Sequence, residues 1–271
     1  MGADLTPSRG RGGRLAGVSN ETAASFRFDE LFDPEEYLHF LDETLRAEDT
    51  EGQVDFAVRA LSLRPGAPVV DLGCGHGRHA LAFARRGYPV VGVDLVEGFV
   101  AMAREAATRE GLRADFVHGD VRTFAVNEPV FEGAVCLFDA FGWFDDDGQM
   151  GILRNVFAML KPGGRLLLDL RTREFVTRLA PVSVTDAGGD LMIDRQRFDL
   201  ESGRLVDTRT TVRGGRTRTV TFSVRVYAYT EIRMMLRAAG FEVERGYGGF
   251  DGAGLSAARP RTLVVARRPW A

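Results

Sequence analysis

The sequence predicts a doubly wound α/β fold: a mostly parallel sheet of seven strands, with N-terminal helices and an antiparallel β-meander inserted after the fifth strand. Three observations lead to this prediction. Short, nearly continuous apolar runs alternate with helical stretches, as in parallel sheets that are buried on both faces. A glycine-rich turn follows the first apolar run. Between residues 181 and 228 the rhythm changes to an alternation of apolar and polar residues.

The predicted parts follow these changes along the 271 residues. Residues 1–25 are rich in Gly, Ser and Arg and are expected to form a disordered tail. Residues 26–64 are expected to form an N-terminal helical cap. The α/β core takes residues 65–180 and 229–271, and residues 181–228 form the inserted antiparallel sheet.

Two amphipathic helices are expected in the cap. The first begins at Pro34, which suits the first helical position because the missing N–H has no intrahelical partner there. The second spans roughly Glu51 to Leu63. Helices that precede the first strand of such a fold can lie over a bound ligand and shape the substrate pocket.

The core is predicted from the positions of its apolar runs. Strands are expected at 68–72, 90–94, 115–118, 134–139, 165–170 and 263–266. Helices are expected near 77–86, 97–111, 147–160 and 230–239. Doubly wound sheets bind ligands beyond the carboxyl ends of their strands, where the strand order reverses. A binding site is therefore expected at that edge.

The inserted meander is predicted to have three or four strands. A strand at 191–198 precedes a turn at Asp199 to Gly203, and Gly214-Gly215 favours a hairpin turn. The last segment places one set of side chains on each face: Val220, Phe222, Val224 and Val226 against Thr221, Ser223, Arg225 and Tyr227. The polar and aromatic second face is expected to line a substrate pocket; a solvated face or a dimer contact explains it equally well.

The turn after the first strand indicates a site for a nucleoside-containing cofactor. Three glycines at alternate positions, Gly73, Gly75 and Gly77, let the backbone turn sharply and bring main-chain N–H groups close to a ligand. Asp94 ends the second strand, where an acid can accept hydrogen bonds from ribose hydroxyls. The spacing differs from the G-x-G-x-x-G of dinucleotide sites, and Asp71 favours a cationic ligand group over a phosphate.

The pattern D-x-G-x-G-x-G resembles motif I of the class I S-adenosylmethionine (SAM)-dependent methyltransferases, and the resemblance runs from about Ala67 to Arg267. Later landmarks follow in the family's order: Asp94, His118-Gly119-Asp120-Val121, Val135 to Gly142, Leu160 to Arg165, and Ala238-Ala239-Gly240-Phe241 before a sixth strand. The resemblance implies a Rossmann-like core, SAM as the methyl donor and S-adenosylhomocysteine as the product. It implies no metal, and the histidines show no ligand spacing with the cysteines.

The resemblance also implies the cofactor-binding residues. Asp94 would bind the ribose, Asp120 would approach the adenine amino group, and Asp71 would help to orient the methionine portion through the glycine loop. The full predicted set is Asp71, Gly73, Cys74, Gly75, Gly77, Asp94, Leu95, Gly119, Asp120, Val121, Leu137 and Phe138.

The acceptor side is predicted from aromatic and titratable residues near the same edge. The catalytic candidates are His39, Tyr37, Arg171 and Tyr227, and the pocket candidates are Phe141, Trp143 and Tyr247. Aromatic walls suit an apolar acceptor and attract a cationic sulfonium. Core packing explains the aromatic residues equally well, and a packing role is the alternative for His39.

Composition restricts the partners. The net charge of −3 and the interleaved acids and bases argue against a nucleic-acid partner. The sequence contains no run of about 18 apolar residues, so no membrane span is expected. The cysteines, Cys74 and Cys136, both lie in the cofactor motifs, so a disulfide framework is not expected and a reducing cytoplasm fits. The edges of the inserted sheet suggest a homodimer.

The predicted function is methyl transfer from SAM to an O or N atom of a small-molecule acceptor, such as a secondary metabolite, by in-line displacement. Two alternatives remain open at this point. One is methylation of a macromolecule such as RNA or a protein. The other is a SAM-binding protein that transfers no methyl group. An NAD-dependent enzyme is disfavoured by the glycine spacing.

Overall fold

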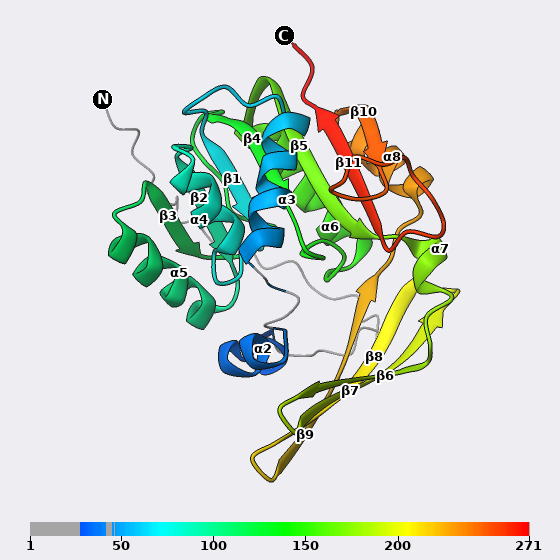
Figure 1. Ribbon diagram of the computed structural model, residues 1–271. Helices are drawn as coiled ribbons and strands as arrows, with labels where there is room; N and C mark the ends of the chain where they lie inside the picture. Colours follow the sequence, from blue (N-terminus) through cyan, green and yellow to red (C-terminus); the bar gives the residue numbers. More distant parts are fainter. Residues whose placement is uncertain (1–27, 42–44, 46, 271) are drawn as a thin grey trace, which may run out of the picture.

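A computed structural model of the protein describes residues 28–41, 45 and 47–270. The tail predicted at 1–25 lies outside the described residues. The described chain forms two sheets, one of seven strands and one of four. The predicted fold class is therefore confirmed, with the smaller sheet inserted after the fifth strand of the larger one (Figure 1).

The seven-stranded sheet has the order β10-β11-β5-β4-β1-β2-β3. Its strands are β1 (Val69–Leu72), β2 (Val90–Asp94), β3 (Ala114–His118), β4 (Phe131–Cys136), β5 (Leu160–Arg171), β10 (Glu242–Tyr247) and β11 (Arg261–Arg267). The first five pair in parallel, while β11 runs antiparallel to both β5 and β10. The strand order reverses between β1 and β4, so a ligand is expected beyond their carboxyl ends.

Helices cover both faces of this sheet because its strands are apolar on both. On one face lie α3 (Ala47–Ala60), α4 (Arg78–Arg85) and α5 (Glu97–Glu110), whose buried residues pack with Val69 and Val90. On the other face lie α6 (Asp146–Met159) and α8 (Tyr229–Ala238), which pack with Val70 and Leu72. Successive residues of β1 thus enter opposite halves of the core, as the two-residue period of a strand requires.

The second sheet is an antiparallel meander of β6 (Val182–Ala187), β7 (Asp190–Asp199), β8 (Arg204–Arg213) and β9 (Arg216–Arg225). The predicted hairpin at Gly214-Gly215 joins β8 to β9, and both glycines have the positive φ that a two-residue turn needs. Figure 1 shows this sheet standing off from the core on the side where α2 (Pro34–Leu41) lies. Helix α2 begins at Pro34 as predicted.

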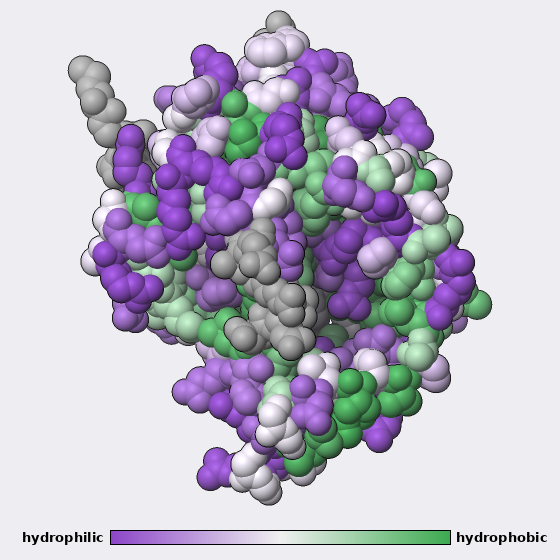
Figure 2. All heavy atoms as spheres, viewed as in Figure 1, coloured by the Kyte–Doolittle hydropathy of each residue, from purple (hydrophilic) through white to green (hydrophobic). Residues whose placement is uncertain are grey.

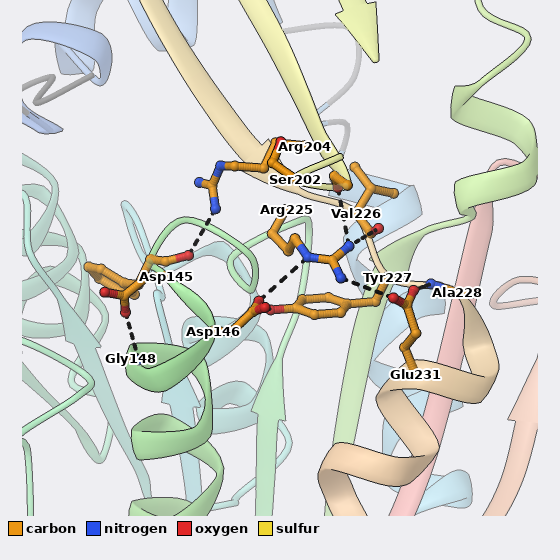
Figure 3. Close-up of polar contacts among 12 residues, drawn as sticks. Asp145, Asp146, Gly148, Ser202, Arg204, Arg225, Val226, Tyr227, Ala228 and Glu231 are labelled. Carbon is orange, nitrogen blue, oxygen red and sulfur yellow. Dashed lines mark hydrogen bonds and ion pairs between the residues drawn. The ribbon is translucent and has the colours of Figure 1, made fainter. Parts of the chain in front are cut away.

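A polar junction fixes the meander to the core (Figure 3). The Arg225 guanidinium donates hydrogen bonds to the Gly203 and Val226 carbonyl oxygens and to Glu231 of α8, and it also pairs with Asp146 of α6. The backbone of Arg225 donates in turn to the Gly142 carbonyl oxygen at 2.8 Å. These contacts set the position of β8 and β9 relative to the strand ends of the core.

Several predicted boundaries are corrected. The second cap helix spans Ala47–Ala60 instead of Glu51 to Leu63, and it ends early because Ser62 takes a positive φ and Pro65 follows. Strand β4 ends at Cys136 instead of 139, because Phe138 and Asp139 both have positive φ. Two short helices were not predicted, α1 (Phe28–Leu31) and α7 (Arg173–Val176).

No helix of the described residues is long and apolar enough to cross a membrane. Figure 2 shows polar residues over most of the visible face, with hydrophobic ones gathered toward the inserted sheet. Val182 and Val184 of the edge strand β6 are 48% and 59% exposed.

Candidate functional site

One cavity of about 280 Å³ lies beyond the carboxyl ends of β1, β2 and β4. It extends from the glycine loop to the inserted sheet, with α1 and α2 beside it. Its lining is Phe28, Leu31, Phe32, Tyr37, Leu41, Gly73, Gly75, Asp94, Leu95, Val96, Phe99, Val121, Phe138, Asp139, Ala140, Trp143, Phe144, Arg171, Leu205, Asp207, Arg209, Phe222 and Val224. The predicted edge of the sheet therefore carries a cavity that two different sheets share.

The glycine loop and Asp94 form one end of the cavity. The Asp94 carboxylate accepts hydrogen bonds from the backbone N–H groups of Gly75 (2.8 Å) and Val96 (2.9 Å), which hold the loop against the end of β2. Gly73 allows close packing, because a Cβ there would lie 2.6 Å from the Ala140 Cβ. A Cβ at Gly75 would meet no atom within 4 Å, so Gly75 borders open space.

Replacing Gly75 with Ala is expected to weaken SAM binding by more than about 10-fold, because the methyl group would occupy space beside the loop. The matched control is Gly111→Ala, at the C-terminus of α5. Gly111 has a similar φ (64° against 55°) and equally open surroundings, so both variants carry the roughly 1–2 kcal/mol cost of a left-handed Ala. Calorimetric titration with SAM should separate them, and equal affinities would show that Gly75 does not face the ligand.

The segment after β4 forms the middle of the cavity and is conformationally strained. Phe138 and Asp139 have φ values of 55° and 62°, a region that bulky side chains rarely adopt. Three hydrogen bonds hold this conformation. The Phe138 N–H donates to Asp169 at 2.8 Å, and Asp139 accepts from Arg171 and Arg261, each at 3.0 Å. Strain of this kind is concentrated at functional sites, where surrounding contacts maintain it.

An ion-pair network below this segment supports it. Arg261 of β11 donates to Asp169 (2.7 Å) as well as to Asp139, so one guanidinium bridges two carboxylates. Asp169 is 1% exposed. Burial acts to raise the pKa of Asp139, but Arg261 and Arg171 hold that pKa below its usual range. Asp139 therefore stays ionised in the cavity wall.

The inserted sheet forms the far end of the cavity. One face of that sheet contributes Leu205, Asp207 and Arg209 from β8, with Phe222 and Val224 from β9. Asp207 is 2% exposed, and burial, with Asp194 nearby, raises its pKa to about 6. The predicted pocket face is therefore corrected: the side bearing Phe222 lines the cavity, and the side bearing Thr221 faces away from it.

Tyr37 lies on α2 within the cavity wall. Its ring packs edge-on against Phe99, with 5.2 Å between centroids. Burial raises the pKa of Tyr37 to about 12, so the hydroxyl stays protonated near neutral pH. Tyr37 can donate a hydrogen bond there but cannot act as a general base.

Nine of the predicted site residues line the cavity: Tyr37, Gly73, Gly75, Asp94, Leu95, Val121, Phe138, Trp143 and Arg171. The other predicted cofactor residues lie behind or beside its wall: Asp71, Cys74, Gly77, Gly119, Asp120 and Leu137. Asp71 is 1% exposed, and burial raises its pKa to about 7. Both oxygens of the Asp120 carboxylate accept hydrogen bonds from the Arg122 guanidinium.

Four acceptor-side residues do not line the cavity. Tyr227 is buried at the junction of Figure 3, where its hydroxyl donates to Asp146 at 3.0 Å. Phe141 packs on Tyr227 in the core. Tyr247 packs edge-on against Phe56. His39 pairs with Asp190 of β7 at 2.9 Å. Each of these side chains packs or pairs outside the cavity, so none of the four lines it.

Sequence reasoning missed the residues that the cap and the meander bring to the cavity. They are Phe28, Leu31, Phe32 and Leu41 of the cap and Leu205, Asp207, Arg209, Phe222 and Val224 of the meander. Five core residues outside the predicted set also line the cavity: Val96, Phe99, Asp139, Ala140 and Phe144. The period-two spacing of Leu205, Asp207 and Arg209 places these three on one face and was the available signal. Nothing in the spacing says which face turns toward the core.

Comparison with known proteins agrees with this geometry. Residues 69–164 match a family model described as a methyltransferase domain. Ubiquinone biosynthesis O-methyltransferase of Xanthomonas campestris pv. campestris (strain B100) is 30% identical over 141 residues, which are 48% of this chain and 58% of that protein. Cypemycin N-terminal methyltransferase of Streptomyces sp is 29% identical over 207 residues, 75% of this chain and 84% of that protein.

Solved structures show the same fold. The CcbJ methyltransferase from Streptomyces caelestis superposes with a TM-score of 0.74 at 23% identity, over 82% of this chain and 90% of that one. The sugar N-methyltransferase KedS8 from Streptoalloteichus sp ATCC 53650 gives 0.66 at 20% identity, over 95% and 100%. Residues 69–164 thus match a methyltransferase domain, and the described chain has the fold of solved methyltransferases, with the glycine loop and Asp94 in one cavity.

Proposed function

We propose that the protein transfers a methyl group from SAM to an N or O atom of a small-molecule acceptor. The observation that carries this proposal is that one continuous cavity joins the glycine loop and Asp94 at one end to aromatic and charged side chains of the inserted sheet at the other. A donor and an acceptor placed at these two ends would meet inside one cavity.

The residues at the first end fit SAM. The Asp94 carboxylate lines the cavity and retains lone pairs for two ribose hydroxyls after accepting its two backbone hydrogen bonds. The open space beside Gly75 admits the methionine portion. Asp120 adjoins Val121 of the lining, but both of its carboxylate oxygens accept from Arg122, so a contact with the adenine amino group would require that pair to open. When bound, SAM supplies an electrophilic methyl group on a sulfonium.

The chain's own residues position the reactants. Phe138, Trp143 and Phe222 provide aromatic walls that suit an apolar acceptor and a cationic sulfonium. Tyr37 lines the same cavity and stays protonated, so its hydroxyl can donate a hydrogen bond to a bound ligand. Alignment of two reactants in a closed site can lower the barrier by roughly 7–11 kcal/mol, which is the main contribution that methyl transfer by in-line displacement needs.

Two relatives support small-molecule or peptide acceptors by their names, an O-methyltransferase of ubiquinone biosynthesis and a methyltransferase of the cypemycin N-terminus. The chain covers only 58% of the first of these proteins, so its substrate is not transferred to this chain. A homodimer through the inserted sheet and a cytoplasmic location stay predictions. The exposed edge strand β6 supports the homodimer, and the molecular mass in solution would decide it.

The test is calorimetric titration of the protein with SAM, S-adenosylhomocysteine and NAD. Micromolar binding of both adenosyl compounds, with no heat from NAD, is expected. Transfer of labelled methyl groups from SAM to a panel of amines and phenols would then establish the activity. Binding of NAD alone would reject the proposal.

A further inference from the structure

We propose that Asp207 binds a basic nitrogen of the acceptor, so that the substrate class is a compound with an apolar or aromatic body and a protonated amine. This inference rests on the proposed function and specifies its acceptor end. It starts from Asp207 Oδ1, a carboxylate oxygen with no hydrogen-bond partner among the described residues.

Asp207 is a buried acid with an unused oxygen. Its Oδ2 accepts a hydrogen bond from the Gln196 side chain at 2.8 Å, while its Oδ1 has no hydrogen-bond partner among the described residues. The residue is 2% exposed and lines the cavity. A buried carboxylate oxygen without a donor is costly, and a donor from the ligand would relieve that cost.

The neighbouring cations are committed to other acids. Arg209 of β8 holds Asp194 of β7 through two hydrogen bonds, of 2.7 and 3.2 Å. Arg171 at the end of β5 donates to Asp139. Asp207 itself has no ion pair within the described part of the chain, and its adjacent partner, Gln196, is neutral. The ligand that best completes this end is therefore a cation that donates hydrogen bonds.

The surroundings of Asp207 suit the rest of such a molecule. Phe222 lies directly across from Asp207 in the pairing of β8 with β9, and its ring centroid is 5.7 Å from that of Trp143. Leu205 lies on the same face two residues before Asp207. Aromatic faces attract ammonium groups and also pack against an apolar body. An acidic acceptor is disfavoured, because both cavity arginines already have carboxylate partners.

The titratable and charged groups that face Asp207 set its response to pH. They are Asp194 on β7, Arg209 on β8 and Arg171 at the end of β5; burial is the largest influence and Asp194 adds to it. The pKa of Asp207 is raised to about 6, so the carboxylate is ionised at pH 8 and largely protonated at pH 5. Amine binding should therefore weaken as the pH falls through about 6.

The experiment compares three probes of similar shape: phenethylamine, phenethyl alcohol and 3-phenylpropionate. Ligand-observed NMR at pH 8, with the protein saturated with S-adenosylhomocysteine, should show the amine binding about 10-fold more tightly than the alcohol, as expected for one charge-assisted hydrogen bond. Asp207→Asn should remove this preference. Asp199→Asn, at the far end of β7 and outside the cavity lining, is the matched control and should keep it.

Two further readouts separate the possible failures. Asp207→Asn should bind S-adenosylhomocysteine within about twofold of the unmodified protein, since Asp207 lies at the other end of the cavity. The raised pKa also means that the ionised carboxylate costs stability above pH 6 and costs nothing below about pH 4, near the ordinary value of 3.8. The variant should accordingly have the higher Tm at pH 8 only, which would show that it folds.

Equal binding of the three probes, or an amine preference that survives in Asp207→Asn, would overturn the inference about Asp207. If S-adenosylhomocysteine fails to bind while the amine preference is found in the protein alone, the proposed methyl transfer is wrong and the amine site stands.

Discussion

Replacing Asp94 with Ala is expected to weaken SAM binding by about 100-fold. Two hydrogen bonds from ribose hydroxyls to a carboxylate, each contributing about 1.5 kcal/mol, correspond to that factor. The same variant removes the acceptor for the Gly75 and Val96 N–H groups, so the loop would also lose its fixed position. Calorimetric titration measures the change directly.

Two variants separate these causes. Asp115→Ala removes an exposed carboxylate from the adjacent strand β3 and should leave SAM affinity unchanged. Asp94→Asn keeps an acceptor oxygen for the loop but loses the charge, and should fall between Asp94→Ala and the unmodified protein. If Asp94→Ala binds SAM within twofold of the unmodified protein, the cofactor is not held at the end of β2.

Replacing Arg261 with Met is expected to destabilise the fold by about 3–5 kcal/mol, because the buried carboxyl groups of Asp139 and Asp169 would lose the cation that they share. A domain of this size then loses roughly 6–20 °C in Tm. The strained Phe138–Asp139 segment would also lose its support, so SAM binding should weaken along with stability. Thermal unfolding at neutral pH measures the first effect.

Arg267→Met is the matched control, six residues further along β11. Arg267 is similarly exposed (20% against 21%), but it pairs with Glu242 and Glu244 at the sheet edge. Surface ion pairs contribute about 1 kcal/mol or less, so a small change is expected.

The two variants should also differ in their response to pH. The pKa of Asp139 is held below its usual range, so its stabilisation is present above the ordinary value of 3.8 and disappears as the pH falls through its folded-state pKa. The deficit of Arg261→Met should therefore shrink toward acid. Equal Tm values for the two variants would show that the Arg261 network does not support the fold.

Local patterns were sufficient for the core. Apolar runs such as Val69 to Leu72 are strands because two helical layers bury both of their faces, and Pro34 begins a helix because its backbone suits the first turn. The same holds for Gly73, Gly75 and Asp94, which are close in space because adjacent parallel strands end at one edge. These features depend on residues that are near in sequence or on a regular topology.

The acceptor end could not be predicted in the same way. Tyr227 and Phe222 are five residues apart, yet the Tyr227 hydroxyl donates to Asp146 outside the cavity, while Phe222 lines the cavity. Which of the two residues reaches the cavity depends on how the meander docks on the core. Arg225 sets that docking through its contacts with α6 and α8. No local signal in β9 contains that information.

The sequence by itself determined the doubly wound core, the position of the inserted meander and the glycine loop at the end of β1, because each depends on periodicity, turn chemistry or strand ends. Only the tertiary structure decided which face of the meander meets the cavity. It also decided that Arg261 bridges Asp139 and Asp169, and that Asp207 is buried with one oxygen lacking a hydrogen-bond partner among the described residues. The physical reason is that burial and pairing of charges arise between segments far apart in the chain, where the cost of an unpaired group depends on what packs around it.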